Sequence, residues 1–204
     1  MADLKIYGYA GSRAVRNLWM CEELGLGYDH IAMTTADGAT RTPEFLEVNP
    51  AGHIPAMDDG GFKLSESLAI NLYLAKKHQR LCPQSLQDEA RAWQWSLWAA
   101  SELDAPIFQW IVNSVILPVE RRNAGLALQA REALEWPLTV INRELASREF
   151  LIPGTDFSVA DLNVASVMYR LLAVDLDSKP YLKCWLTKCW GRPAAKKARA
   201  MREG

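Results

Sequence analysis

Residues that could stabilise an anion stand where a strand-like run gives way to a helical pattern. Residues 10–16 read A-G-S-R-A-V-R, and Ser12 stands at that junction. A hydroxyl there can donate a hydrogen bond to an anion, and a helix N-terminus adds a favourable dipole. Tyr7 offers a second hydroxyl and Arg13 a positive charge. Each also has a plainer interpretation, since serine caps helices, a strand tyrosine is often core, and an arginine on a helix is usually exposed.

A second stretch with binding potential runs from Asn49 to Ser67, N-P-A-G-H-I-P-A-M-D-D-G-G-F-K-L-S-E-S. Its prolines and first glycine predict a loop, and D-G-G between two short strand-like runs predicts a hairpin. An apolar helical run then begins at Glu66. The free N–H groups of such a helix N-terminus bind anions, and the Ser67 hydroxyl could assist. The alternative is that Ser65-Glu66-Ser67 only starts a helix well.

These two stretches together resemble the cytosolic glutathione S-transferase family. The second stretch is similar to the glutathione-binding signature of that family, which reads N-x-x-G-(K/H)-(V/I)-P, then a hairpin, then (E/Q)-S at a helix start. The spacing S-x-x-x-R from Ser12 to Arg16 resembles that of bacterial, serine-type members.

The resemblance implies a role for each residue in holding glutathione, a co-substrate. Ser67 would bind the γ-glutamyl carboxylate and Glu66 the amine of the same group. Ile54, ahead of a cis Pro55, would offer its backbone to the cysteinyl part. His53 stands where many relatives have lysine and would donate to the glycine carboxylate, although its charge depends on pH.

The implied chemistry is formation of a thiolate from a thiol whose pKa is about 8.5. Lowering that pKa by about 2 units takes roughly 2.7 kcal/mol. Ser12 is the predicted donor to the sulfur and Tyr7 the rival, with Arg13 adding charge. The turn has no cysteine, which disfavours a disulfide reductase. It has only one serine, which disfavours a maleylacetoacetate isomerase.

The first part of the chain predicts a β-α-β-α-β-β-α order. Strands at 4–9 and 28–33 flank a helix at 13–24, and a short helix follows Thr42-Pro43. A strand, a crossover helix and a second strand imply a parallel pair. This is the order of an α/β thioredoxin-like domain, which we place at residues 1–78, with a linker at 79–87.

Residues 88–204 predict an all-α domain. A helix over 88–105 carries Trp93, Leu97 and Ala100 on one face, and proline breaks follow at 106 and 118. A helix over 126–145 is predicted to kink at Pro137. Ser158-Val-Ala-Asp161 is a capping-box variant that begins an apolar helix, the expected centre of this domain.

The electrophile's pocket is expected between the two domains. Its candidate lining residues are Trp98, Phe108 and Trp110, although aromatic residues at helical spacing are more often core. The resemblance also implies a role for Asp104 at a partner subunit's glutathione, as an acid has in some relatives.

Composition excludes several other classes of function. A net charge of −1 over 204 residues disfavours nucleic-acid binding. No apolar run reaches the roughly 20 residues of a membrane span, and no signal peptide is evident. Four cysteines without C-x-x-C spacing and three scattered histidines predict no metal site and few disulfides. We therefore expect a cytoplasmic protein.

The sequence thus predicts a glutathione S-transferase that conjugates glutathione to small hydrophobic electrophiles. The resemblance also implies a homodimer. The alternatives are glutathione-dependent peroxidase or isomerase chemistry, or a binding or regulatory protein of this fold without catalysis.

Overall fold

The computed structural model describes residues 2–204, which divide into two compact units. The first comprises the described chain through Cys82 together with Gly191–Gly204, and the second is Pro83–Trp190. Helix α9 (Pro193–Glu203) therefore groups with the first unit, whereas we predicted one helical domain over residues 88–204.

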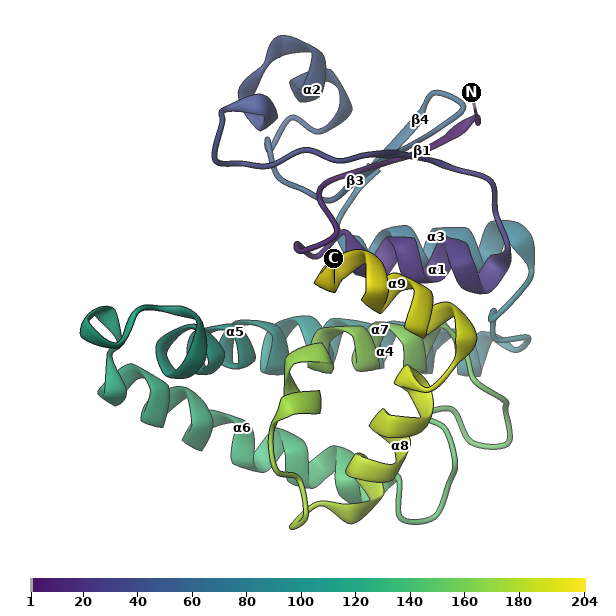
Figure 1. The fold of residues 1–204 in the computed structure, drawn as a ribbon. Coiled ribbons are helices and arrows are strands. Elements are labelled where there is room, and N and C mark those ends of the chain that lie inside the picture. Colours follow the sequence, from purple (N-terminus) through teal and green to yellow (C-terminus); the bar gives the residue numbers. More distant parts are fainter. Residues whose placement is uncertain (1) are drawn as a thin grey trace. The chain divides into compact units, whose positions relative to one another are not determined.

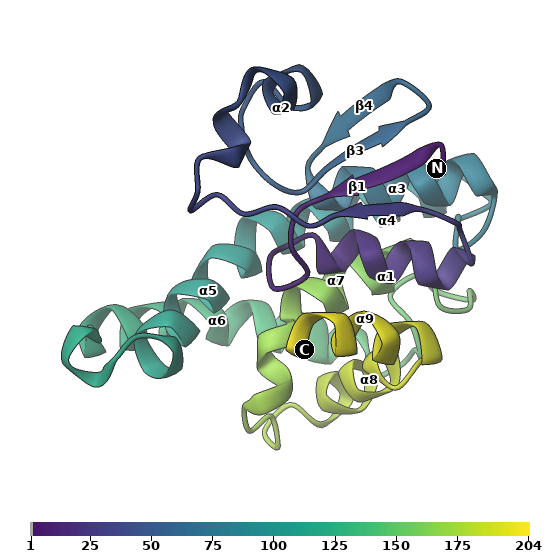
Figure 2. The same ribbon diagram turned by 45° about the horizontal axis from the view of Figure 1, so that its top comes forward.

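The first unit is built on a mixed sheet of order β2-β1-β3-β4 (Figures 1 and 2). β1 pairs in parallel with β2, and the pairs β1–β3 and β3–β4 are antiparallel. The parallel pair and the hairpin confirm the predicted thioredoxin-like arrangement. The strands are β1 Leu4–Tyr7, β2 Asp29–Ile31, β3 Ala56–Asp59 and β4 Phe62–Ser65.

Helices cover both faces of this sheet. α1 (Val15–Leu24) and α3 (Ser67–His78) lie side by side on one face, and α2 (Pro43–Val48) lies on the other (Figure 1). α2 begins as predicted, since the Thr42 side chain accepts from the Phe45 N–H at 3.3 Å. Fully buried side chains from the sheet and from α1 and α3 form the core: Ile6, Leu18, Met57, Ile70 and Leu74.

The start of α1 differs from the expectation. The helix begins at Val15 after Ala14, not at Arg13 after a Ser12 cap. The Ser12 hydroxyl instead accepts from the Ala14 N–H at 3.1 Å in the turn before the helix. Serine forms such local turns as readily as helix caps, so sequence alone could not distinguish the two.

The second unit is entirely helical. Pro106 does not end the helix at its position, because the π-helical stretch Ala99–Asp104 continues directly into α5 (Ala105–Ile111), with Pro106 in its first turn. Pro137 lies inside α6. The helices are α4 Leu86–Trp98, α5 Ala105–Ile111, α6 Ala124–Glu144, α7 Val159–Val167 and α8 Pro180–Trp190, with π-helical stretches at Ala99–Asp104 and Val112–Ile116 and a 3₁₀ turn at Met168–Ala173.

α7 is the buried centre of the second unit, as predicted. All its residues are buried, and its capping box is formed by Ser158 and Asp161. The Asp161 carboxylate also accepts from the Leu151 N–H at 2.9 Å and from Trp185 Nε1 at 3.0 Å. Buried donors require partners, so this carboxylate ties α7 to α8 and to the loop before α7.

α4 turns a different face inward from the one the apolar spacing indicated. Ala92 and Trp95 are buried, whereas Trp93 is 45% and Leu97 is 71% exposed. Leu86, eleven residues before Leu97, is 69% exposed. Positions separated by seven and eleven residues share one helix face, so α4 presents an apolar stripe to solvent.

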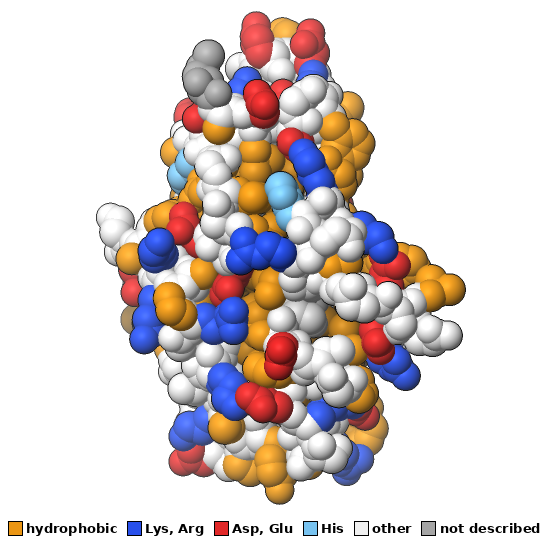
Figure 3. Space-filling view, turned by 90° about the vertical axis from the view of Figure 1, so that its right-hand side faces the viewer, with side chains coloured by type: hydrophobic (Ala, Val, Ile, Leu, Met, Phe, Trp, Pro, Cys, Tyr) orange, Lys and Arg blue, Asp and Glu red, His pale blue; other side chains and the backbone are white. Residues whose placement is uncertain are grey.

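Other features of the described residues 2–204 concern membranes, metals and disulfides. None of their helices is long and apolar enough to span a membrane. Among them there is also no group of three potential metal-ligating side chains, and none of their four cysteines forms a disulfide. On the face drawn in Figure 3, acidic and basic side chains are interspersed rather than gathered in one patch.

Candidate functional site

Sheet register brings the predicted site segments to one end of the first unit's sheet. Tyr7, the last residue of β1, pairs with Ala56 at the start of β3, and Ala56 pairs with Ser65 at the end of β4. The loop before α1, the loop that ends in Pro55 and the start of α3 therefore all leave the sheet beside this row. Residues that are more than forty positions apart in sequence meet there.

Gly8 allows two of these segments to touch. A Cβ on Gly8 would lie 3.0 Å from Ala14 Cβ and 3.2 Å from Ile54 Cβ, and the backbone φ is +124°. A side chain there would separate the loop before α1 from the segment that precedes Pro55. The contact thus places the turn that carries Ser12 next to Ile54.

Ser12 lies half-buried in that turn. Its hydroxyl donates to the Tyr9 carbonyl at 2.6 Å, and its N–H donates to the same oxygen at 2.9 Å. Rotation about the Cα–Cβ bond could redirect the hydroxyl towards an incoming anion while the backbone bond holds the turn. The geometry is that of a donor in a preformed loop, close to the N-terminus of α1.

Tyr7 and Arg13 flank Ser12 in chain order. The Tyr7 ring packs against Phe45 of α2 with centroids 5.8 Å apart, and it is only half-exposed. This contact with α2 is what a packing role predicts. Arg13 is exposed on the turn, as its plainer interpretation predicted.

The segment before β3 is shaped by a cis peptide bond between Ile54 and Pro55, as the resemblance implied. Pro55 is buried, Ile54 is half-buried and His53 is exposed. The buried Asn49 holds the loop, because its amide donates to the His53 carbonyl at 2.7 Å and its side-chain oxygen accepts from the Ala51 N–H at 3.2 Å. Asn49 therefore orients the backbone just before Ile54.

The start of α3 has an unusual backbone. Glu66 has a φ of +69°, and its side chain is exposed and makes no capping hydrogen bond. A non-glycine residue in such a conformation costs on the order of 1–3 kcal/mol, which points to a functional constraint. Helix-start chemistry alone does not explain why a glutamate stands here.

Ser67 is buried and is linked to α1. Its hydroxyl accepts from Arg16 NH1 at 3.2 Å, and its carbonyl accepts from Asn17 Nδ2 at 2.8 Å. Arg16 is itself only 5% exposed. A buried guanidinium therefore adds positive charge at the N-terminus of α3, where the helix dipole already favours an anion.

Arg41 is a further candidate that the sequence analysis missed. Its guanidinium donates to the Ala51 carbonyl at 3.0 Å, and a Cβ on Gly52 would meet NH1 at 2.3 Å. An exposed cation thus lies against the loop that carries His53. The sequence signal was weak, because one arginine in a polar loop is indistinguishable from a solvated side chain.

The aromatic residues proposed for the electrophile lie in the second unit and contact different elements there. Trp98 meets Trp95 edge to face at 5.2 Å. Arg170 lies over the Phe108 ring at 5.4 Å, and Arg131 of α6 lies over Trp110 at 6.0 Å. Of the three, Phe108 is the most exposed, at 44%.

Asp104 is half-buried at the junction of the first π-helical stretch with α5.

Comparison with known proteins identifies the family. Residues 2–76 match the family model described as glutathione S-transferase, N-terminal domain. The chain is 32% identical to glutathione S-transferase 4 of Zea mays over 203 residues, covering 95% of this chain and 91% of that protein.

Solved structures agree. Glutathione S-transferase-I bound with lactoylglutathione has a TM-score of 0.87 at 29% identity, covering 97% of this chain and 99% of that one. The theta class glutathione S-transferase from Xanthomonas axonopodis pv. citri, with glutathione bound, has a TM-score of 0.88 at 28% identity, covering 97% of each chain. The first relative is a plant protein, so the likeness extends beyond the bacterial members that the sequence pattern resembled. This chain belongs to the glutathione S-transferase family.

Proposed function

We propose that this protein binds glutathione, converts its thiol to a thiolate and conjugates it to small hydrophobic electrophiles. The observation that carries the proposal is the single sheet end at which the Ser12 turn, the cis Ile54–Pro55 bond and the N-terminus of α3 meet. Two relatives of known structure hold glutathione or a glutathione derivative, according to their descriptions.

The start of α3 would bind the γ-glutamyl group. The γ-glutamyl carboxylate would accept hydrogen bonds from the N–H and the hydroxyl of Ser67. The buried Arg16 and the helix dipole would favour its negative charge. The exposed Glu66 carboxylate would accept from the amine. The unusual backbone of Glu66 supports this role, because it turns a charged side chain away from helix capping.

The loop before β3 would hold the rest of the tripeptide. The backbone of Ile54 would pair with the cysteinyl part in strand fashion, and Asn49 keeps this backbone in place. His53 and Arg41 would donate to the glycine carboxylate from the same loop region.

Ser12 would stabilise the sulfur anion by redirecting its hydroxyl from the Tyr9 carbonyl. A charge-assisted hydrogen bond together with the N-terminus of α1 can supply much of the roughly 2.7 kcal/mol that a 2-unit fall in thiol pKa requires. Tyr7 packs on Phe45 and is the lesser candidate. Phe108 is the exposed aromatic residue best suited to contact a hydrophobic electrophile.

The test combines binding with turnover. Isothermal titration with glutathione should show binding, and a chloronitrobenzene substrate should be conjugated. A matched pair of variants, Ser67→Ala and Ser85→Ala, separates the site from a serine that caps α4. Ser67→Ala should weaken glutathione binding about tenfold, the cost of one charge-assisted hydrogen bond, and Ser85→Ala should not. Binding without turnover would show a glutathione-binding module, and absence of both would overturn the proposal.

We also propose a cytoplasmic homodimer. Four cysteines without a disulfide among the described residues fit a reducing compartment. The α4 stripe of Leu86, Trp93 and Leu97 is exposed in the single chain, and exposed apolar patches mark interaction surfaces. In the first unit, Phe62 is 49% exposed and packs against Tyr73 with ring centroids 4.9 Å apart, and it would offer an apolar surface to the α4 stripe of a second copy.

A further inference from the structure

The C-terminal helix α9 packs along α1 within the first unit (Figures 1 and 2). Its buried face consists of Ala195 and Ala198, whose small side chains let the two helices approach closely. At the start of α9, Arg192 makes a bidentate ion pair with Glu23, with nitrogen–oxygen distances of 2.7 and 2.8 Å. Glu23 is almost completely buried in this pair, with 7% of its side chain exposed.

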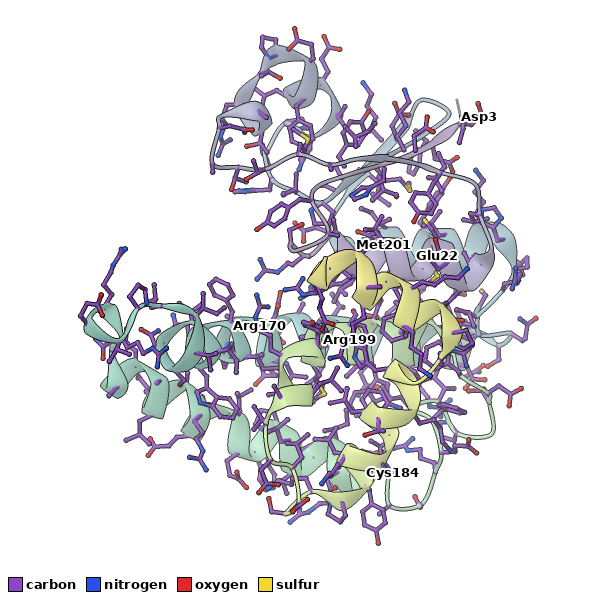
Figure 4. The ribbon with its side chains drawn as sticks, in the orientation of Figure 1. Asp3, Glu22, Arg170, Cys184, Arg199 and Met201 are labelled. Atoms are coloured by element: carbon purple, nitrogen blue, oxygen red, sulfur yellow. The ribbon has the colours of Figure 1, made fainter. Side chains whose placement is uncertain are left out.

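A second contact lies further along the helix pair. The Tyr28 hydroxyl donates to Glu22 Oε1 at 3.1 Å and lies 3.9 Å from the Met201 sulfur. Figure 4 labels Glu22 on α1 and Met201 on α9, the two residues that the Tyr28 hydroxyl contacts. α9 is thus attached to the first unit at more than one point along its length.

The geometry brings the end of α9 to the Ser12 turn. The start of α9 meets the end of α1 through Arg192 and Glu23. Near the other end of α9, Arg202 reaches the turn before α1, where its Nη1 donates to the Ser12 carbonyl at 3.0 Å and to the Ala10 carbonyl at 3.3 Å. The two helices therefore run antiparallel.

These two hydrogen bonds bracket Gly11. A Cβ on Gly11 would lie 2.7 Å from the Tyr9 ring, so a side chain there would displace that ring. The Ser12 hydroxyl meanwhile donates to the Tyr9 carbonyl of the same turn. The turn is thus stabilised by hydrogen bonds within it, from Ser12 to Tyr9, and by hydrogen bonds from the Arg202 guanidinium, which belongs to a distant segment of the chain.

We propose that Arg202 is a positioning residue for thiol activation, acting through the backbone of the Ser12 turn. It holds the Ala10 and Ser12 carbonyls, which fixes the backbone position from which the Ser12 hydroxyl rotates towards the sulfur, and it adds a positive charge beside that turn. A preorganised donor stabilises an anion better than one that must first be ordered. This inference rests on the proposed function, because it assumes that Ser12 donates to the glutathione sulfur.

The test is the pKa of enzyme-bound glutathione, followed by the ultraviolet absorbance of the thiolate as pH is raised. In Arg202→Met this pKa should rise by about one unit, from about 6.5 to about 7.5, which lowers the thiolate fraction at pH 6.5 about fivefold. kcat/KM at pH 6.5 should also fall about fivefold, and the deficit should close above about pH 9, where glutathione ionises without assistance. A purely structural role would lower activity equally at every pH.

Two further variants complete the design. Arg202→Lys keeps a charge and donors of similar reach, so it should restore most of the thiolate fraction. Arg199→Met removes an exposed arginine of α9 that bonds to Glu203 of the same helix at 2.7 Å, and it should leave the bound pKa unchanged. If Arg202→Met reduces stability, the pKa of bound glutathione is measured at a temperature below the melting temperature of the variant. A pKa equal to that of the wild type overturns the inference.

The outcomes separate this inference from the proposed function. A wild-type protein that fails to bind glutathione or to lower its thiol pKa overturns the proposed function. A wild-type protein that lowers the pKa, with Arg202→Met equally effective or Arg199→Met equally impaired, overturns only the role of Arg202.

Discussion

Ser12 occupies a turn in which backbone and side chain share one acceptor. The Tyr9 carbonyl takes hydrogen bonds from both the Ser12 N–H and its hydroxyl, so the hydroxyl can leave without loss of the turn. Tyr7 lacks this freedom, because its ring is packed on Phe45. A mobile hydroxyl on a fixed backbone is the arrangement that a donor to a transient anion requires.

The Ser12 proposal makes a direct prediction. Ser12→Ala should raise the pKa of bound glutathione by about 1–2 units from about 6.5 and so lower kcat/KM near pH 6.5 about 5- to 50-fold, in proportion to the thiolate fraction. Tyr7→Phe should change either quantity less than threefold. Thiolate absorbance and steady-state kinetics measure both, and an inactive Tyr7→Phe beside a fully active Ser12→Ala would transfer the role to tyrosine.

The proposed role of Glu66 predicts that Glu66→Gly has opposite effects on stability and on glutathione binding. Glu66→Gly relieves a positive φ and should raise the free energy of unfolding by about 1 kcal/mol, measured by urea denaturation. It also removes the carboxylate proposed to bind the glutathione amine, so glutathione affinity should fall about tenfold. Glu66→Gln, which keeps the backbone strain, is the control and should weaken binding without the gain in stability.

At the scale of elements, a polar cluster ties the β-hairpin to α3. Asp59 at the end of β3 accepts from the Tyr73 hydroxyl at 2.8 Å and pairs with Lys77, both on α3. Burial acts against the charged carboxylate, but the hydrogen bonds from Lys77 and Tyr73 outweigh it and hold the pKa of Asp59 below its ordinary value of 3.8. The same pairing raises the pKa of Lys77 above 10.5.

The sign of the pH dependence follows from these shifts. The Asp59 contribution to stability is present above pH 3.8 and is lost as pH falls through the lowered pKa of the folded state. The Lys77 contribution is present below pH 10.5 and is lost at higher pH. Asp59→Asn should therefore cost about 1 kcal/mol at pH 7, a modest value because Lys77 is 42% exposed.

Urea denaturation at several pH values measures this effect. The difference between wild type and Asp59→Asn should shrink at a pH well below 3.8. Glu47→Gln, a change at an exposed carboxylate of α2, should have little effect at any pH. A cost that persists unchanged at acid pH would show that Asp59 acts through packing rather than charge.

At the scale of the whole molecule, the α4 stripe predicts the oligomeric state. Burying a leucine stabilises an interface by about 1.5–3 kcal/mol, and a charge at that position removes this gain and adds a desolvation cost. Leu97→Glu should weaken a homodimer at least tenfold, as measured by analytical ultracentrifugation. Leu126→Glu, at an exposed leucine of α6, is the matched control and should not.

Much of this protein could be predicted from local sequence. The βαβαββα order, the Thr42 cap of α2, the Ser158–Asp161 capping box and the glycine hairpin all depend on residues a few positions apart. The cis bond before Pro55 came from the family resemblance rather than from local chemistry. Local spacing failed for α4, because a helix with two apolar faces gives no sign of which one is buried.

Tertiary structure alone decided the rest, because the decisive contacts join distant residues. Sequence supplied Ser12, Glu66 and Ser67, but only the pairing of β1, β3 and β4 brought their segments to one sheet end. Arg16 beneath Ser67 and Arg202 on the Ser12 turn depend on packing across 51 and 190 residues. A side chain's type determines what it can bind, whereas its partner is determined by which helices and strands pack together.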